Sequence, residues 1–384
     1  MSRGQADPDW LHQLALGAED YESAALFLRT AAERAAASLA FERAAELYRT
    51  CLDDQTLDTA ERGELLRALA DNLAASGHGS QAAEQYLQAS QLQAASRASS
   101  VTELKRLAAT HLIRSGHFAR GEQLVREVLR SLQIRVPRSR LGLLLAIGWE
   151  RLRLWLRGLN FSPRPVSQLP AARLHKVHAY ISLSINTQAY DPVRATLFGT
   201  RALRLGLELG ERGTLASALA VAAASRAVSG SAHDERYAQK LLDYASTINA
   251  SLQDPYVGAR ISAARTMTAF LLGRVRETLP LAEESEQLHS NHTSTRAEFA
   301  GEYYNRFTVN SALIGALFQL GRFREASVAL HRALQHARAT DNRTAQLHLA
   351  MVWSLDDIAQ GQAERARARL DADRPELPPG FGPL

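Results

Sequence analysis

Apolar residues recur at helical spacing along most of the chain, in paired segments with a glycine between them. The clearest pair spans residues 313 to 334, with Gly321 at its centre. Leu317 precedes this glycine by one helical turn, and Ala326 and Ala333 follow it. Small residues allow two antiparallel helices to approach closely, and larger apolar side chains fill the flanks. The pattern predicts a helical hairpin.

The same spacing recurs around other glycines, so the chain contains an internal repeat. Gly77 and Gly116 each have the small and apolar residues at the expected distances. A first unit fits without a glycine, through Phe41, Ala44, Tyr48 and Cys51, and units around Gly273 and Gly361 fit loosely. Because the spacing between the glycines varies, we expect long and degenerate units.

Two further helix starts are indicated by aspartate before proline, at Asp191 and at Asp254. Aspartate is a favoured N-cap residue, and proline is tolerated at the first helical position. Three more hairpins are predicted: residues 171 to 188 with 192 to 210, 213 to 229 with 233 to 251, and 255 to 272 with 275 to 289. No alternating β pattern is present, so the fold class is all-α, an α-solenoid of about 17 to 19 helices.

The hairpins resemble tetratricopeptide repeats. The similarity is carried by the G-x-F-x-x-A pattern of Gly321, Phe323 and Ala326, at the start of a second helix. The resemblance implies a right-handed superhelix whose first helices line a concave face that binds peptides or partner helices.

The resemblance also places that concave face on particular residues. In the two better N-terminal units the expected positions are Glu64, Arg67, Asp71, Glu103, Arg106, Thr110 and Arg114. The arginines could clamp carboxylates in bidentate fashion, although an ordinary charged helix surface is the favoured interpretation. In the unit of Gly273 the same positions are Arg260, Ala263, Met267, Phe270 and Leu271. That wall is apolar, so either a neighbouring stack covers it or it holds a hydrophobic ligand.

Charge is concentrated in one segment. Residues 130 to 176 carry ten basic side chains and the single acid Glu150, whereas the net charge of the whole chain is only +5. Within this segment, prolines bracket a helix predicted to begin at Ser139 and to end near Arg157. It forms a basic amphipathic element whose distinctive residues are Arg140, Trp149, Arg151, Arg153, Trp155 and Arg157.

Several roles compete for this basic helix. It could dock on a partner helix, lie on an anionic membrane surface or touch phosphates. We favour a packing helix that joins two stacks, because a solenoid joint could bury its apolar residues. In that case Trp149 and Trp155 are buried, and Arg153 is dispensable for stability.

The arginine-rich stretch GWERLRLWLRGLNF, after the repeat that opens with AAERAAASLAFERAAELYRTCL, sharpens the resemblance. It is similar to the C-terminal region of large bacterial signalling proteins, in which a serine/threonine kinase domain and an AAA-type ATPase domain precede helical repeats. The resemblance implies a non-enzymatic scaffold or sensory module. Its partner would be a protein or peptide, such as that kinase or ATPase domain in cis. The alternative is the helical-repeat part of an ATP-dependent transcriptional regulator.

Five segments are expected along the chain. They are a lead-in over residues 1 to 19, an N-terminal array over 20 to 133, the basic joint over 134 to 170, a C-terminal array over 171 to 370 and a disordered tail over 371 to 384. The tail is rich in proline and glycine, which opposes packing.

Motifs for catalysis and for cofactors are missing from the sequence. There is no G-x-x-x-x-G-K-[ST] loop, no H-R-D or D-F-G and no G-x-S-x-G. His175 and His178 have metal-compatible spacing but no third ligand, and the lone Cys51 is expected to be a buried thiol. We therefore expect no enzyme activity in this chain, no cofactor and no metal. With no apolar run long enough to span a bilayer, no secretory signal and one cysteine, a cytoplasmic protein is expected.

Overall fold

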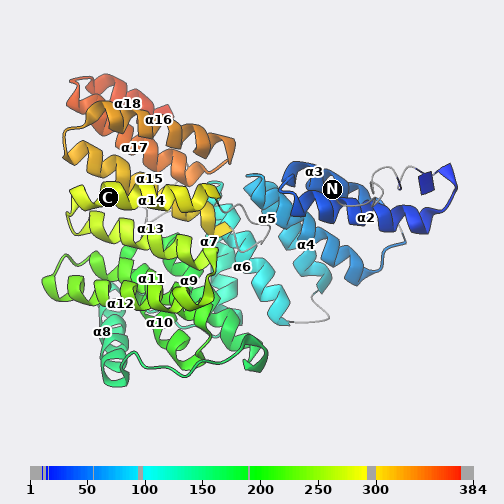
Figure 1. The fold of residues 1–384 in the computed structure, drawn as a ribbon, viewed down its shortest axis with the longest axis horizontal. Helices are drawn as coiled ribbons and strands as arrows, with labels where there is room; N and C mark the ends of the chain where they lie inside the picture. The colour runs from blue at the N-terminus through cyan, green and yellow to red at the C-terminus, as the bar shows by residue number, and fades with distance from the viewer. Residues whose placement is uncertain are drawn as a thin grey trace. The chain divides into compact units, whose positions relative to one another are not determined.

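A computed structural model describes residues 17–54, 56–93, 98–188, 191–291 and 300–372, together with Leu11, Leu14 and Ala15. In this part of the chain there are seventeen α-helices, α2 to α18, one short 3₁₀-helix and no strand (Figure 1). Consecutive helices pack against each other in series. The all-α, solenoid-like architecture predicted from the apolar spacing is confirmed, with a helix number at the lower end of the predicted range.

The chain divides into two compact units, one made mainly of residues up to Val128 and the other mainly of residues from Leu129 onward. The first unit is built of three consecutive helical hairpins. Their helices are α2 (Tyr21–Ala37), α3 (Phe41–Leu52), α4 (Thr59–Ala75), α5 (Gly79–Leu92), α6 (Ala98–Arg114) and α7 (Phe118–Ser131).

The glycine-centred turns of the first unit have the left-handed backbone that the sequence predicts. Gly77 and Gly116 have φ values of +89° and +83°. After Gly77, the N–H of His78 donates to a carbonyl in the last turn of α4 at 2.8 Å, which satisfies a helix-end acceptor. In the unit without a glycine, Leu39 occupies this position at φ +64°, and the N–H of Ala40 makes the equivalent bond at 2.9 Å. The repeat geometry is therefore kept even where its glycine is absent.

In the second unit, hairpins are stacked in chain order, as the change of colour from green to red in Figure 1 shows. The helices are α8 (Arg140–Arg157), α9 (Ala171–Thr187), α10 (Pro192–Leu209), α11 (Arg212–Ala227), α12 (Ala232–Leu252), α13 (Pro255–Leu271), α14 (Val275–Asn291), α15 (Ala300–Gln319), α16 (Phe323–Ala339), α17 (Arg343–Ala359) and α18 (Ala363–Ala372). The 3₁₀-helix is Val166–Gln168, between α8 and α9.

Both predicted aspartate caps are present. The side chain of Asp191 accepts a hydrogen bond from the N–H of Arg194 at 3.0 Å, and that of Asp254 accepts one from the N–H of Tyr256 at 2.9 Å. In each case proline occupies the first turn of the helix. The start of α10 and the start of α13 are thereby fixed by local sequence.

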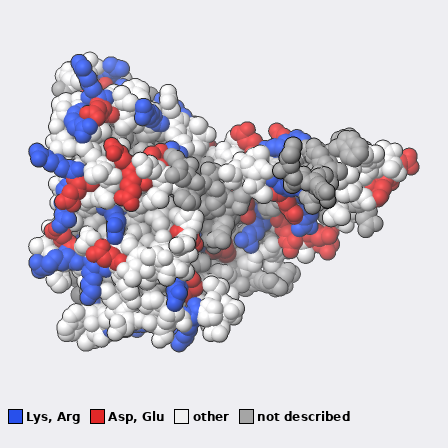
Figure 2. Space-filling view, viewed as in Figure 1, with Lys and Arg blue, Asp and Glu red and all other residues white. Residues whose placement is uncertain are grey.

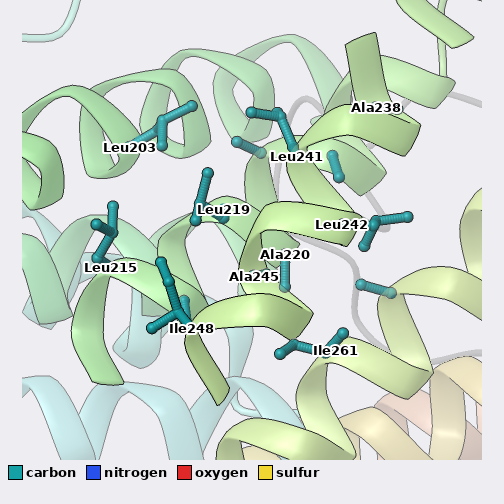
Figure 3. Close-up of a cluster of buried hydrophobic side chains, with 14 of the residues drawn as sticks. Leu203, Leu215, Leu219, Ala220, Ala238, Leu241, Leu242, Ala245, Ile248 and Ile261 are labelled. Atoms are coloured by element: carbon teal, nitrogen blue, oxygen red, sulfur yellow. The ribbon is translucent and has the colours of Figure 1, made fainter. Parts of the chain in front are cut away.

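The main core of the second unit lies where α10, α11, α12 and α13 meet. Figure 3 shows leucine and isoleucine side chains from these helices, among them Leu203, Leu219, Leu241 and Ile261, directed toward one another with alanines between them. The alanines allow the close helix approach that the sequence pattern indicates. On the face shown in Figure 2, basic and acidic side chains are interspersed over this unit.

α8 packs on α10 through a face that differs from the expected one. Leu143 and Leu154 are only 4% and 3% exposed, whereas Trp149 and Trp155 are 60% and 78% exposed. The prediction that the two tryptophans are buried in a joint is therefore wrong.

The physical reason is the position of Glu150, the one acid of the basic segment. Its carboxylate is buried on the Leu143 face of α8 and accepts hydrogen bonds from Arg201 at 3.2 Å and Arg204 at 2.7 Å, both on α10. A buried carboxylate needs such partners. The pairing turns the Glu150 face inward, and the tryptophan face is left outward.

Parts of the expected ends lie outside the described residues, namely most of the 1 to 19 lead-in and residues 373 to 384 of the tail. Asp371 and Ala372 belong to α18, so this helix continues slightly further than expected. None of the helices that the structure describes is long and apolar enough to span a membrane.

Candidate functional site

The second unit contains a cavity of about 600 Å³, which falls within the size range of small-molecule sites. Its walls come from α9, α11, α13, α15 and α17, which are the first helices of five consecutive hairpins. α9 packs on α11, and α11 packs on α13, so these three first helices form a continuous wall. We call this space the α13 cavity.

α13 contributes the residues that the repeat spacing placed on its inner wall. Arg260, Ala263, Met267, Phe270 and Leu271 all line the cavity. The five residues that the repeat spacing assigned to one wall therefore do lie on one wall, and four of them are apolar. Among the described residues no neighbouring stack fills the space.

Other lining residues escaped the sequence analysis although the repeat contains a signal for them. The offsets that lead from Gly273 back to the five α13 residues lead from Gly321 back to Thr308, Ser311, Gly315, Phe318 and Gln319. All five residues of this second set, which belong to α15, line the α13 cavity. The positions that line the cavity in the unit of Gly273 thus predict the lining positions in the unit of Gly321.

Small side chains on neighbouring helices help to keep the cavity open. Ala220 and Ala224 of α11 and Ala263 of α13 all line it. At Gly315 of α15, a Cβ atom would lie 2.5 Å from the ring of Phe270, so only glycine allows the ring to rest there. The aromatic ring and the small residues together give walls that are mostly hydrocarbon.

Arg260 is the charged side chain among the described residues that line the cavity, and only 9% of it is exposed. Its guanidinium stacks on the ring of Tyr256 at 4.5 Å and donates a hydrogen bond to the hydroxyl of the same tyrosine. Its Nε atom is buried without a hydrogen-bond partner, and the ion pairs of the described residues do not include this arginine. Burying a cation without a counter-ion is costly, so the cavity favours an anionic group beside Arg260.

His348 of α17 lines the same cavity and is uncharged at neutral pH. Its imidazole meets the ring of Phe307 edge-on at 5.2 Å between centroids. Burial lowers the pKa of this histidine, because the charged form would lose its hydration. Arg260 therefore supplies the positive charge in the cavity.

The predicted binding face of the first unit has a different character. Glu64 and Arg67 are exposed, and Glu64 lies 3.7 Å from Arg29. Arg106 is held by Glu103 of its own helix through two hydrogen bonds, at 2.8 Å and 2.5 Å. This arginine is already paired with a carboxylate.

The two positions nearest the end of α6 are largely hidden. Thr110 is buried and its hydroxyl donates to the carbonyl of Arg106 at 3.1 Å, and Arg114 is also buried. The seven positions therefore do not form one evenly accessible face.

Asp71, the remaining predicted residue, belongs to a buried polar cluster. Its carboxylate accepts a hydrogen bond from the hydroxyl of Tyr86 at 2.6 Å, and the ring of Tyr86 stacks with that of His111 at 5.8 Å. Burial raises the pKa of Asp71 to about 6, with the Tyr86 hydrogen bond acting in the opposite direction. Burial likewise lowers the pKa of His111 to about 3. The cluster is a structural polar network between α4, α5 and α6.

The remaining candidates for chemistry do not assemble into a site. Cys51 is buried, and burial raises the pKa of its thiol to about 11, which opposes formation of a reactive thiolate. His178 contacts the hydroxyl of Thr214 at 3.2 Å. Within the described ranges no three histidine, cysteine or acidic side chains gather in a metal-binding arrangement.

Comparison with models of protein families gives no match to this chain. No curated protein shows significant sequence similarity to it.

Proposed function

We propose that the chain is a non-enzymatic sensory and interaction module that binds an apolar molecule bearing an anionic group in the α13 cavity. The proposal rests above all on Arg260, a buried cation that has no counter-ion among the described residues, in an apolar cavity of about 600 Å³. We further propose that the hairpins are tetratricopeptide repeats in a right-handed superhelix. The module would serve a bacterial signalling system alongside a serine/threonine kinase and an ATPase, as the resemblance implies.

The hydrocarbon walls supply affinity. Each methylene group moved from water into an apolar site contributes ~0.8 kcal/mol. A medium-length alkyl chain laid along Met267 and Phe270 would gain several times this amount, offset in part by the entropy lost on binding. The hydrocarbon walls therefore account for binding of the ligand's alkyl chain, but they do not select the polar group at its end.

Arg260 supplies that selection. A guanidinium presents its donors in a planar fork that matches a carboxylate, and the buried Nε–H is one of those donors. A neutral head group would leave the cation without a counter-charge. An ammonium group would repel it at close range in a medium of low dielectric constant.

A ligand bound in the α13 cavity can affect the packing of the other hairpins of the second unit. Because the walls come from five successive hairpins, a bound molecule would touch helices that otherwise interact only with their neighbours. It would thereby stabilise one curvature of the stack. We propose that this change in curvature is the signal read by a protein or peptide partner.

The test uses three probes with the same alkyl chain and different head groups: decanoate, decanol and decylamine. Calorimetric titration of the chain should show decanoate binding about tenfold or more tightly than decanol, and decylamine weakest. In Arg260→Met the preference for decanoate should disappear while decanol binding remains.

Two variants serve as controls. Arg265→Met removes another arginine of α13, one that contacts Asp243 and Ser246 and does not line the cavity, and it should bind all probes as the unchanged chain does. Ala224→Trp, at a partly exposed lining position of α11, should fill the cavity and weaken all three probes. Equal binding of the three probes, or an unchanged decanoate affinity in Arg260→Met, would contradict the proposal.

A further inference from the structure

α8 has a second apolar face that the described part of the protein leaves uncovered. Its inner face, with Leu143, Ile147, Glu150 and Leu154, is buried against the rest of the second unit. The outer face consists of large apolar side chains that are all exposed: Leu141, Leu144, Leu145, Trp149, Leu152, Trp155 and Leu156. Contiguous exposed apolar surface of this kind usually marks a binding face.

The outer face is broad. At about 100° per residue, its seven side chains fall within an arc of about 140° around the helix axis. The seam that a coiled-coil partner covers is narrower than this. A flat apolar medium, in contrast, covers the whole arc at once.

The outer face of α8 is flanked by arginines and not by acidic residues of this helix. By the same geometry, Arg140 lies at one edge of the arc and Arg153 at the other, and both are exposed. Glu150, the one acid between residues 130 and 176, points to the opposite face and is buried. The outer face therefore combines hydrocarbon with positive charge on both sides.

Not every arginine of α8 is available to an external partner. Arg151 lies 3.9 Å from Asp234, and Arg157 donates hydrogen bonds to the carbonyls of Asn160 and Leu207, both at 2.8 Å. These two side chains hold the helix in place. Arg140 and Arg153 remain as the charges that flank the outer face.

This combination matches the interface of an anionic bilayer better than other partners. Tryptophan and leucine on one side of a helix, with arginine beside them, are typical of helices that lie in the plane of a membrane surface. Arginine stems can run along the apolar layer while their guanidinium groups reach phosphates, and tryptophan is enriched at this level of the bilayer. Nucleic acid would pair with the arginines but leave seven apolar side chains in water, and a second copy of α8 would bring arginine edges close to each other.

We propose that α8 binds the surface of an anionic lipid bilayer, with its outer face in the acyl boundary and Arg140 and Arg153 at the level of the phosphates. The second unit would thereby be held at a membrane surface without spanning the bilayer. This proposal does not depend on the α13 cavity, since none of the α8 residues lines it.

Vesicle flotation with the full chain tests the proposal. The protein should bind phosphatidylcholine vesicles that contain phosphatidylglycerol about tenfold or more tightly than pure phosphatidylcholine vesicles. Binding should weaken as salt is raised, because salt screens the arginines. The double variant Trp149→Ala/Trp155→Ala should lose most binding to both vesicles, and Arg140→Glu/Arg153→Glu should lose the preference for the anionic ones.

The matched control removes exposed apolar side chains from other helices, in Val328→Ala/Ile358→Ala. Both residues are about as exposed as Trp149, and this variant should bind like the unchanged chain. Circular dichroism melting of each variant verifies folding, and the arginine variant alone remains decisive if the tryptophan variant does not fold.

Three results would overturn the proposal. One is the absence of binding to anionic vesicles, and another is vesicle binding that none of the α8 substitutions changes. The third is self-association of the full chain in sedimentation velocity that is lost in the tryptophan variant, which would make the outer face a protein interface.

Discussion

Replacing Glu150 by alanine should destabilise the second unit by ~3 kcal/mol, although the residue lies in the most basic segment of the chain. Its buried carboxylate accepts charge-assisted hydrogen bonds from Arg201 and Arg204, each worth ~1.5–3 kcal/mol. Arg204 keeps Glu208, and Arg201 keeps the carbonyl of Arg135 at 2.8 Å, so neither cation loses every partner. The expected loss therefore lies at the low end of the ~3–5 kcal/mol that breaking a buried ion pair costs.

The effect of Glu150→Ala on stability is best compared with that of a substitution on the outer face of the same helix. Trp155 is 78% exposed, so Trp155→Ala should change the free energy of unfolding by ~0.5 kcal/mol or less. Urea unfolding followed by circular dichroism measures both, and a double-mutant cycle with Arg204→Met isolates the ion pair. If Trp155→Ala cost more than Glu150→Ala, α8 would have to face α10 with its tryptophan side, and the account of the outer face would fail.

Three further predictions concern the first unit. Leu39→Gly should raise stability by ~1 kcal/mol, because Leu39 holds a left-handed turn at φ +64° that glycine adopts without strain, and a lower midpoint of urea unfolding would contradict this. Asp71 has a folded pKa raised to about 6, so its contribution to stability is full below about pH 4 and is lost as pH rises through about 6. Asp71→Asn should remove ~3 kcal/mol of that pH dependence, because a shift of one pKa unit corresponds to ~1.4 kcal/mol. Urea unfolding curves in which both proteins show the same change of stability with pH would refute this prediction. Cys51 should react with a thiol reagent at neutral pH only when the first unit unfolds locally, because the thiol is buried and its pKa is raised to about 11. Rapid labelling of Cys51 in the folded protein would contradict its burial.

Local sequence was sufficient for much of the helical framework. The turn glycines and the two aspartate caps act within a few residues, and Asp191, Asp254, Gly77 and Gly116 all have the predicted geometry. The inner wall of α13 was also predictable, because the repeat register assigns each position of a first helix to the same side. These features need no knowledge of distant partners.

The orientation of α8 could not be predicted in the same way. Apolar residues occur on two of its faces, so the spacing alone does not indicate which face is buried. The choice is made by Glu150 together with Arg201 and Arg204, which lie about fifty residues further along the chain. Likewise, the repeat register placed Arg260 on the correct wall. That no acid of the described residues pairs with it is evident only from the packing of the neighbouring helices.

The measurement that tests the central claim most directly is photo-crosslinking with a decanoate analogue that carries a diazirine on its alkyl chain. Peptide mapping by mass spectrometry should place the label on α13 and α15, at residues such as Met267, Phe270 and Phe318, and unlabelled decanoate should compete it away. In Arg260→Met the labelling at these positions should fall. Label found mainly on the outer face of α8, or spread without competition over both units, would contradict the assignment of the α13 cavity as a binding site for apolar anions.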